Sequence, residues 1–224
     1  MNIDRIRTLI DKYIVDYVYN AARIEGVNTK YLDTKLLVDE GIEPHLDSDK
    51  IIVLKNLKDA YKALKDDKFL SQSIDLNSLK KVNLIINGRG LVREAGRLRV
   101  DSVYLTNCNY TPEIPDEYTI NNDILDIIGQ NKNVLDIGIE LYLYIMRSQP
   151  FIDGNKRTAN VFANLYLMQH DSSLISVHAS KKKHFLKLLT SFCETNNPNK
   201  LVEFIKNNGL YTISWNKYLF TFYF

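Results

Sequence analysis

Hydrophobic residues recur at every third or fourth position over long parts of this chain. That spacing puts them on one face of an α-helix, whereas a half-buried strand would alternate at every second position. We therefore predict a mainly α protein. The two most regular runs consist of Ile6, Leu9, Ile10, Tyr13, Ile14 and Tyr17, and of Leu54, Leu57, Ala60, Tyr61 and Leu64.

Residues 134–147 form a third candidate helix, with the sequence VLDIGIELYLYIMR. The segment is apolar nearly all round, which is typical of a central helix that is buried on several sides. We expect the helix to end at Ser148-Gln149-Pro150, because a proline disfavours helical geometry in the residue before it.

One segment, residues 88–105, interrupts the helical pattern. It contains three glycines, and Leu98 and Val100 alternate with polar residues, so we predict a short β-hairpin or an extended flap. The loop after it contains two prolines and leads to a helix that we expect to start near Asp123.

Charge and composition exclude several classes of protein. The 29 basic and 27 acidic residues are well mixed and give a net charge of +2, without the concentrated basic patch of a nucleic-acid-binding protein. No apolar run approaches the roughly 20 residues that cross a bilayer, and the charged N-terminus does not resemble a signal peptide. We expect no nucleic-acid or membrane partner, and a protein that works in the cytoplasm or is delivered from it as an effector. Cys108 and Cys193 lack metal-ligand spacing and are expected to be reduced thiols.

The chain shows no internal repeat and no convincing linker, so one compact domain is favoured. Within it we distinguish an N-terminal helical region (1–84), a core (85–205) and an aromatic C-terminal segment (206–224). Packing of the last segment on the chain's own domain is favoured over a contact in a homodimer. Its aromatic residues at helical spacing are Tyr211, Trp215, Tyr218 and Phe222.

The sequence FIDGNKR, residues 151–157, has the features of an anion-binding loop. A glycine-containing turn before a helix leaves free N–H groups at the positive end of the helix dipole. Lys156 and Arg157 add two cations there, and Asp153 brings the hard oxygen ligand that Mg²⁺ bridging phosphates would require. The alternative is an ordinary Asp-Gly-Asn turn before a solvated first helical turn.

Three stretches of the chain resemble the Fic/Doc family of Fido-fold proteins, in the family's order. The loop QPFIDGNKRTAN resembles the family signature, roughly HPFx(D/E)GNxRxxR. The stretch REAGRLRVDSVYLTNCNYTP is similar to the family's flap hairpin, and YNAARIEGVNT to its inhibitory helix, (S/T)xxxE(G/N). The resemblance implies a Fic-fold helical bundle with a β-hairpin flap at 88–105 and an active-site loop at 149–160. The matching signature residues are Pro150, Phe151, Asp153, Gly154, Asn155 and Arg157.

Fic proteins typically transfer AMP from Mg-ATP to a Tyr, Thr or Ser hydroxyl of another protein, and the Doc branch transfers phosphate. By this resemblance Asp153 would bind Mg²⁺, and ATP or another nucleotide would be the donor. Gly154 and Asn155 would line the phosphate cradle, where Lys156 and Arg157 would bind nucleotide phosphate.

The resemblance also implies a partner and a form of control. Residues 96–105 would hold a protein substrate by adding a strand, a mode that uses backbone hydrogen bonds. Glu25 occupies the position of the family's inhibitory glutamate, although Ala21 replaces the family's Ser or Thr. Its carboxylate would pair with Arg157 or Lys156 and obstruct the nucleotide, or would position a water for removal of a modification.

Three residues depart from the family pattern. Gln149 stands in place of the histidine that takes the proton from the attacking hydroxyl. Histidine can do this because its unperturbed pKa, roughly 6.5, lies near the operating pH, whereas an amide has no basic nitrogen at neutral pH. Lys156 stands where AMP-transferring members usually have glycine, which makes the loop resemble the Doc type. Asn160 replaces a second arginine that binds the γ-phosphate and pairs with the inhibitory glutamate in the family.

These features leave three functions open. The first is an AMP- or phosphotransferase that is slow or autoinhibited because Gln149 replaces the catalytic histidine. The second is a catalytically inactive Fic-fold module that binds nucleotide or protein. The third is a hydrolase that uses Glu25 to remove the modification.

Overall fold

The structure, a computed structural model, describes residues 3–106, 108–170 and 172–211. Within these residues it is mainly α, as predicted, with ten α-helices, one short 3-10 helix and two short strands. No helix among them is long and apolar enough to cross a membrane. The elements are α1 (Ile3–Glu25), α2 (Tyr31–Asp39), α3 (Ser48–Ala63), α4 (Asp67–Leu70), α5 (Leu76–Ile86), α6 (Glu117–Ile128), α7 (Val134–Ser148), α8 (Asn155–Gln169), β1 (Leu174–Ile175), η1 (Ala179–Lys181), α9 (Lys182–Thr195), α10 (Asn199–Asn208) and β2 (Leu210–Tyr211).

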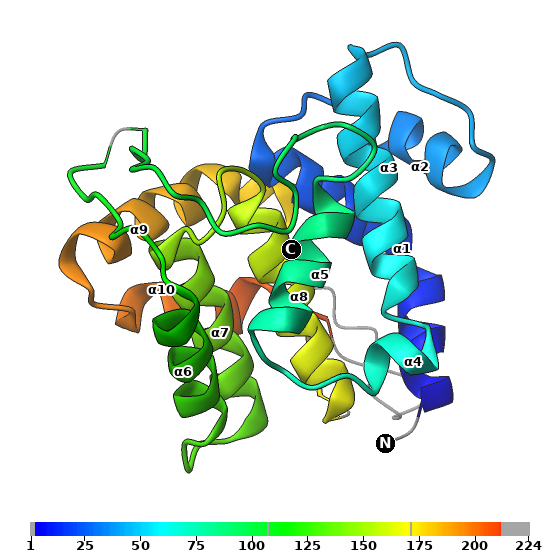
Figure 1. The fold of residues 1–224 in the computed structure, drawn as a ribbon. Coiled ribbons are helices and arrows are strands. Elements are labelled where there is room, and N and C mark those ends of the chain that lie inside the picture. The colour runs from blue at the N-terminus through cyan, green and yellow to red at the C-terminus, as the bar shows by residue number, and fades with distance from the viewer. Residues whose placement is uncertain (1–2, 107, 171, 212–224) are drawn as a thin grey trace.

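Helix α8 lies at the centre of the molecule (Figure 1), where α1, α5 and α7 pack against it. Every residue from 157 to 168 is buried. Helix α7 comes very close to it at Gly138, where an added Cβ atom would lie 2.5 Å from Leu167 Cδ2. The central position of α8 fixes the direction of its N-terminal end, which carries the predicted anion site.

The predicted helix at 134–147 is confirmed as α7, but α8 is the helix that is most completely surrounded. The burial of α8 could not be predicted from its sequence, because the helix contains several polar residues. Asn164, for example, is 0% exposed, donates a hydrogen bond to the carbonyl of Ile175 at 2.9 Å and accepts one from the backbone N–H of Ile175 at 2.7 Å. Buried amides that are hydrogen-bonded in this way do not oppose burial of the helix.

The two amphipathic runs are confirmed as faces of α1 and α3, which pack against each other. Tyr17 and Tyr61 meet there with ring centroids 5.3 Å apart. Tyr211, from the predicted aromatic segment, packs edge-on against Tyr17 at 5.2 Å, so this part of the segment lies on its own domain. The other three aromatic residues named for that segment lie outside the described residues. The buried members of the two runs are Leu9, Ile10, Ile14, Tyr17, Leu54, Leu57, Ala60, Tyr61 and Leu64.

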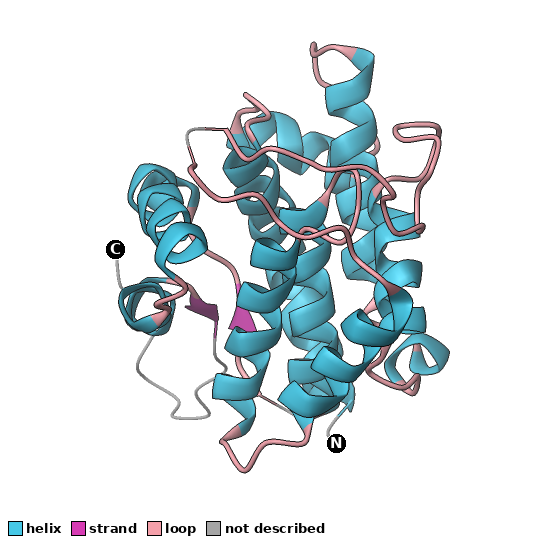
Figure 2. Ribbon diagram, turned by 60° about the vertical axis from the view of Figure 1, so that its left-hand side comes forward, coloured by secondary structure: helices cyan, strands magenta, loops and turns pink. Residues whose placement is uncertain are grey.

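Residues 88–105, which we call the flap segment, form turns, bends and irregular backbone without a β-strand. The predicted β-hairpin is therefore wrong for this segment, and the alternative of an extended flap stays a prediction. Figure 2 shows that the strands are few and short; β1 and β2 pair antiparallel, with Leu174 opposite Tyr211. Helix α6 begins at Glu117 rather than near Asp123, because the side chain of Asp116 caps the N–H of Thr119 at 3.0 Å.

Two of the predicted region boundaries fall inside helices. Helix α5 runs across the boundary between residues 84 and 85, and α10 runs across the boundary between 205 and 206. Helix α5 also packs against both α3 and α8. The N-terminal helices and the core therefore share one continuous set of packed helices.

The two cysteines are free thiols in different surroundings. Cys193 is 2% exposed, and burial raises its pKa to about 12, whereas Cys108 is half-buried. Because the thiolate is the reactive form, a disulfide reagent at pH 8 is expected to modify Cys108 in the native protein and Cys193 only after unfolding. Absorbance of the released thiol checks this. Rapid modification of the native Cys108→Ser variant would contradict it.

Candidate functional site

The predicted anion loop lies at the N-terminal end of α8. Its N-cap residue is Gly154, with φ of 75°, and no side chain caps the helix there. The first turn contains no acidic residue, but it contains Lys156 and Arg157. A helix end of this kind concentrates positive potential and N–H donors without a neutralising group of its own.

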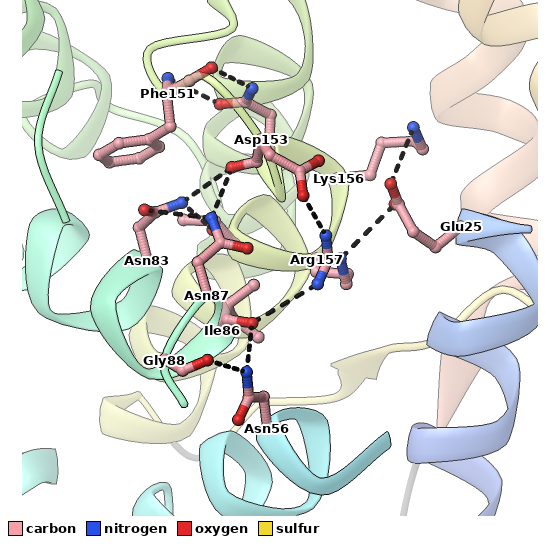
Figure 3. Close-up of polar contacts among 12 residues, drawn as sticks. Glu25, Asn56, Asn83, Ile86, Asn87, Gly88, Phe151, Asp153, Lys156 and Arg157 are labelled. Atoms are coloured by element: carbon pink, nitrogen blue, oxygen red, sulfur yellow. Dashed lines mark hydrogen bonds and ion pairs between the residues drawn. The ribbon is translucent and has the colours of Figure 1, made fainter. Parts of the chain in front are cut away.

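Helix α5 holds this loop in place through two asparagines one turn apart (Figure 3). Asn87 donates to the carbonyl of Asp153 at 2.8 Å, and Asn83 donates to the same carbonyl at 3.2 Å. Asn83 also donates to Thr158 Oγ1 at 3.0 Å. Glycine is required at 154, since a Cβ atom there would lie 2.7 Å from Asn87 Oδ1. The sequence prediction missed both asparagines, for which the only signal was their spacing of four on one helix face.

Arg157 is a buried cation in a fixed position, with 3% of its side chain exposed. Its Nη2 lies 3.1 Å from Asp153 Oδ2, and its Nη1 donates to the carbonyl of Ile86 at 3.5 Å. That carbonyl also accepts a hydrogen bond from Asn56 at 3.1 Å. Asp153 is 48% exposed, so one member of this pair is fixed inside the protein and the other faces solvent.

Glu25, the last residue of α1, reaches the same helix end (Figure 3). Its carboxylate oxygens lie 3.6 Å from Lys156 Nζ and 3.9 Å from Arg157 Nε. These ion pairs are loose: within the described structure, Glu25 Oε2 and Arg157 Nε are buried without a hydrogen-bond partner. A carboxylate at a helix C-terminus and cations at a helix N-terminus are each unfavourable for their own helix, so here they compensate each other.

Gln149 follows α7 in the left-handed conformation, with φ of 47° and ψ of 59°. Both ends of its side-chain amide are engaged. Nε2 donates to the carbonyl of Met146 at 2.5 Å, and Oε1 accepts from Asn155 at 3.0 Å. Asn155 also bonds both backbone groups of Phe151, so its amide holds the loop together. Neither group of the Gln149 amide is a base, and both serve the shape of the loop.

Asn160 lies one turn further along α8 and is 7% exposed. It accepts a hydrogen bond from the Tyr61 hydroxyl at 2.7 Å and donates to the carbonyl of Ile175 at 2.9 Å. Burial raises the pKa of Tyr61 well above its usual value, so this hydroxyl stays protonated as a donor. A cavity of about 20 Å³ lies beside Asn160, Tyr61, Tyr142 and Arg157. The position at which the resemblance implies a second arginine is thus occupied by a neutral, hydrogen-bonded side chain.

The flap segment is joined both to α5 and to the loop. The N–H of Gly96 donates to Asn83 Oδ1 at 2.9 Å, and the N–H of Arg99 donates to the carbonyl of Pro150 at 3.0 Å. The structure therefore brings together the flap segment, the 149–157 loop and Glu25, which the sequence predictions placed in one site. Arg99, like the two asparagines, was not among the predicted residues.

Comparison with known proteins places this geometry in a family context. Residues 73–167 match the family model described as the Fic/DOC family. Protein adenylyltransferase fic-1 of Caenorhabditis elegans is 26% identical over 170 residues, covering 68% of this chain and 31% of that protein. Its counterpart in Caenorhabditis briggsae is 25% identical, with the same coverage. The chain thus spans about a third of the length of the curated relatives it matches.

Solved structures with the same fold include a Fic domain-containing signalling protein from Bacteroides thetaiotaomicron. It superposes with a TM-score of 0.70 at 19% identity, covering 91% of this chain and 84% of that one. Fic-1 from C. elegans superposes with a TM-score of 0.69 at 19% identity, covering 91% of this chain and 66% of that one. At 19% sequence identity, this structural similarity establishes the fold alone.

The arrangement of helices defines a mainly α protein with the Fic fold. More particularly, residues 73–167 of the chain match the model of the Fic/DOC family. This region includes α5, the flap segment, α6, α7, the 149–157 loop and most of α8. Glu25 and Asn56 contribute to the site from outside it.

Proposed function

We propose that this protein binds a Mg²⁺-nucleotide at the N-terminal end of α8 and transfers AMP or phosphate to a protein hydroxyl, slowly and under restraint by Glu25. The observation that carries the proposal is the pairing at this helix end. Lys156 and Arg157 have no acidic residue in their own turn, and a carboxylate from α1 lies 3.6 and 3.9 Å from them. A nucleotide phosphate satisfies the same electrostatic demand.

The residues present fit a magnesium ion that is shared with phosphates. Mg²⁺ in nucleotide sites is held by one or two carboxylates together with phosphate oxygens and waters, rather than by a protein cage. Asp153 supplies one half-exposed carboxylate at the helix end. Among the described residues there is no group of three or more potential metal ligands that would form a cage. The ion would neutralise phosphate charge, and Asp153 would hold it.

The flap segment supports a protein rather than a small molecule as the acceptor. Residues 98–105 form neither a helix nor a strand, so their backbone is not paired in a sheet, which suits the addition of a strand by a substrate segment. Val100 and Tyr104 are 80% and 83% exposed, and they offer apolar contacts on that surface. The Gly96 and Arg99 links hold the segment beside the loop.

A second function, a binding module without transfer, is favoured by Gln149. Its amide is anchored to Met146 and Asn155, and it cannot accept a proton at neutral pH. A hydrolase that uses Glu25 is less favoured, because two cations already engage the carboxylate that would orient the water.

Transfer is tested with ATP labelled at the α or the γ position, Mg²⁺ and a protein extract. We expect weak labelling by the wild-type protein and stronger labelling by the Glu25→Gly variant. Labelling from the α position identifies AMP transfer, and labelling from the γ position identifies phosphate transfer. If neither protein labels any acceptor although both bind ATP, the binding-module function replaces the proposal.

Measurements of nucleotide affinity test the proposed restraint by Glu25 separately from the transfer reaction. The Glu25→Gln variant is expected to bind Mg-ATP about tenfold more tightly, because the nucleotide no longer displaces a carboxylate from two cations. The Arg157→Met variant is expected to lose on the order of a hundredfold in affinity, since it removes a charged hydrogen-bond donor. Isothermal titration calorimetry measures both changes.

The matched control is Glu203→Gln, which removes an exposed carboxylate from α10. It is expected to leave the affinity unchanged. Equal affinities of the wild-type and Glu25→Gln proteins would show that Glu25 does not compete with the nucleotide. An unchanged affinity in Arg157→Met would place the nucleotide elsewhere.

A further inference from the structure

Arg99 is a buried arginine whose side-chain acceptors are all backbone carbonyls. It is 4% exposed. Its Nε donates to the carbonyl of Gln149 at 2.7 Å, and its Nη1 to that of Asp101 at 2.7 Å. Its Nη2 donates to the carbonyls of Glu113 at 2.5 Å and Pro112 at 3.3 Å. One side chain therefore joins the flap segment, the bend after α7 and the loop before α6.

The chemistry of the guanidinium explains why an arginine is needed there. It presents five N–H donors in a rigid plane, so it can serve carbonyls that lie in different directions. Burial lowers the pKa of Arg99 below its usual value, but the group remains charged. Lysine has the same charge with one nitrogen, and it cannot reach carbonyls on three segments at once.

The bend that Arg99 holds contains the residue at the catalytic position of the family. Gln149 has a left-handed backbone, which is unfavourable for a residue other than glycine and persists when the surroundings fix it. Its N–H donates to Ile145 within α7, and its side chain bonds Met146 and Asn155 on the inner side. Arg99 binds the carbonyl on the other side of the bend.

We propose that Arg99 is a positioning residue, which fixes the backbone at residue 149 and so sets the direction of that side chain relative to the flap segment. The backbone bond from Arg99 to Pro150 and the bond from Gly96 to Asn83 keep the flap segment in register with the loop. The functional meaning of this register rests on the proposed transfer, since a hydroxyl held along the flap segment has to meet residue 149.

The structural part of the proposal is tested by hydrogen exchange of side-chain amides, observed by ¹⁵N nuclear magnetic resonance. The Gln149 amide is assigned by its loss in Gln149→Glu. We expect its protons to exchange at least about tenfold faster in Arg99→Lys and Arg99→Gln than in the wild type, since a tenfold change corresponds to about 1.4 kcal/mol of lost local stability. The Arg97→Gln variant, which removes an exposed arginine of the same segment, is the control.

The Gln169 amide distinguishes positioning from a general loss of stability. It donates at 2.8 Å to the carbonyls of Leu70 and Gln72, far from the loop in sequence. A positioning role accelerates exchange at Gln149 alone, whereas acceleration at both amides overturns the proposal. Unchanged exchange at Gln149 in folded Arg99→Gln also overturns it. If both Arg99 variants fail to fold, the exchange rate of the Nε proton of Arg99 in the wild-type protein is measured instead. Slow exchange supports the bond from Nε to the Gln149 carbonyl, and rapid exchange contradicts it.

An activity measurement tests the functional part in the Gln149→His background. There Arg99→Lys is expected to lower kcat by about 10- to 100-fold with the KM for nucleotide unchanged, because misplacement of a catalytic group affects the chemical step. A rise in KM at constant kcat would overturn this role. If Gln149→His transfers nothing, the proposed transfer fails, while the exchange experiment still decides whether Arg99 positions residue 149.

Discussion

The Gln149→His variant is expected to transfer AMP or phosphate on the order of 10²–10⁴-fold faster than the wild-type chain, because it restores a general base. The surroundings of residue 149 are already arranged for a specific side-chain direction. Its backbone is held by Ile145 and Arg99, and Asn155 offers a hydrogen-bond donor beside it. The substitution therefore changes the chemistry of one side chain whose surroundings are already fixed.

Initial rates with labelled ATP check this prediction, with Gln149→Asn as the control that keeps an amide. The rate of Gln149→His is expected to rise with pH through about 6.5, because the imidazole must be neutral to accept a proton. Combination with Glu25→Gly is expected to raise the rate further. A Gln149→His protein that is no faster than Gln149→Asn would show that the missing base is not what limits transfer.

The Gly154→Ala variant is expected to unfold at a temperature roughly 5–15 °C lower, which corresponds to about 2–4 kcal/mol for a chain of this size. Gly154 has φ of +75°, and a Cβ atom there would lie 2.7 Å from Asn87 Oδ1. Moving Asn87 away would break its 2.8 Å bond to the carbonyl of Asp153. Loss of nucleotide binding is expected together with the loss of stability.

Gly90→Ala is the matched control for this change. Gly90 has φ of +77°, and nothing lies within 4 Å of a Cβ atom built on it. It therefore measures the backbone strain alone, for which about 1 kcal/mol is expected. Thermal unfolding by circular dichroism gives both values. If the two substitutions lower the unfolding temperature equally, the contact with Asn87 does not contribute to the loss of stability.

The flap segment shows where a sequence pattern gives the wrong structure. Alternation of Leu98 and Val100 with polar residues favoured a short β-hairpin or an extended flap, and a half-buried strand would bury its apolar side chains. At residues 99 and 100 the structure shows the opposite burial: the polar Arg99 is 4% exposed, whereas the apolar Val100 is 80% exposed. A cluster of backbone carbonyls from distant segments holds the arginine inside, and no local pattern contains that information.

The site itself could be predicted only in part. The glycine turn and the two cations of α8 are local features, so Asp153, Lys156 and Arg157 follow from the physics of a helix N-terminus. Glu25 is remote in sequence and was found only through the family resemblance. The spacing of Asn83 and Asn87 was too weak a signal to assign them a role, because a buried amide acquires its role from partners that tertiary packing supplies.

The location of Glu25 on α1 determines how the proposed restraint could be lifted. The same helix contributes Ile10, Tyr17 and Val18, all 0% exposed, to the core. Exposing side chains of this kind costs about 1.5–3 kcal/mol each, which together exceeds the 1–3 kcal/mol that a typical effector supplies. Dissociation of the whole helix, as a way of removing Glu25 from the site, would therefore cost more free energy than a typical effector supplies. Fraying of the final turn before Gly26, where φ is +110°, would withdraw the carboxylate and expose Ala22 and Ile24, while Ile10, Tyr17 and Val18 stay buried. An activator of this protein would accordingly act at one helical turn.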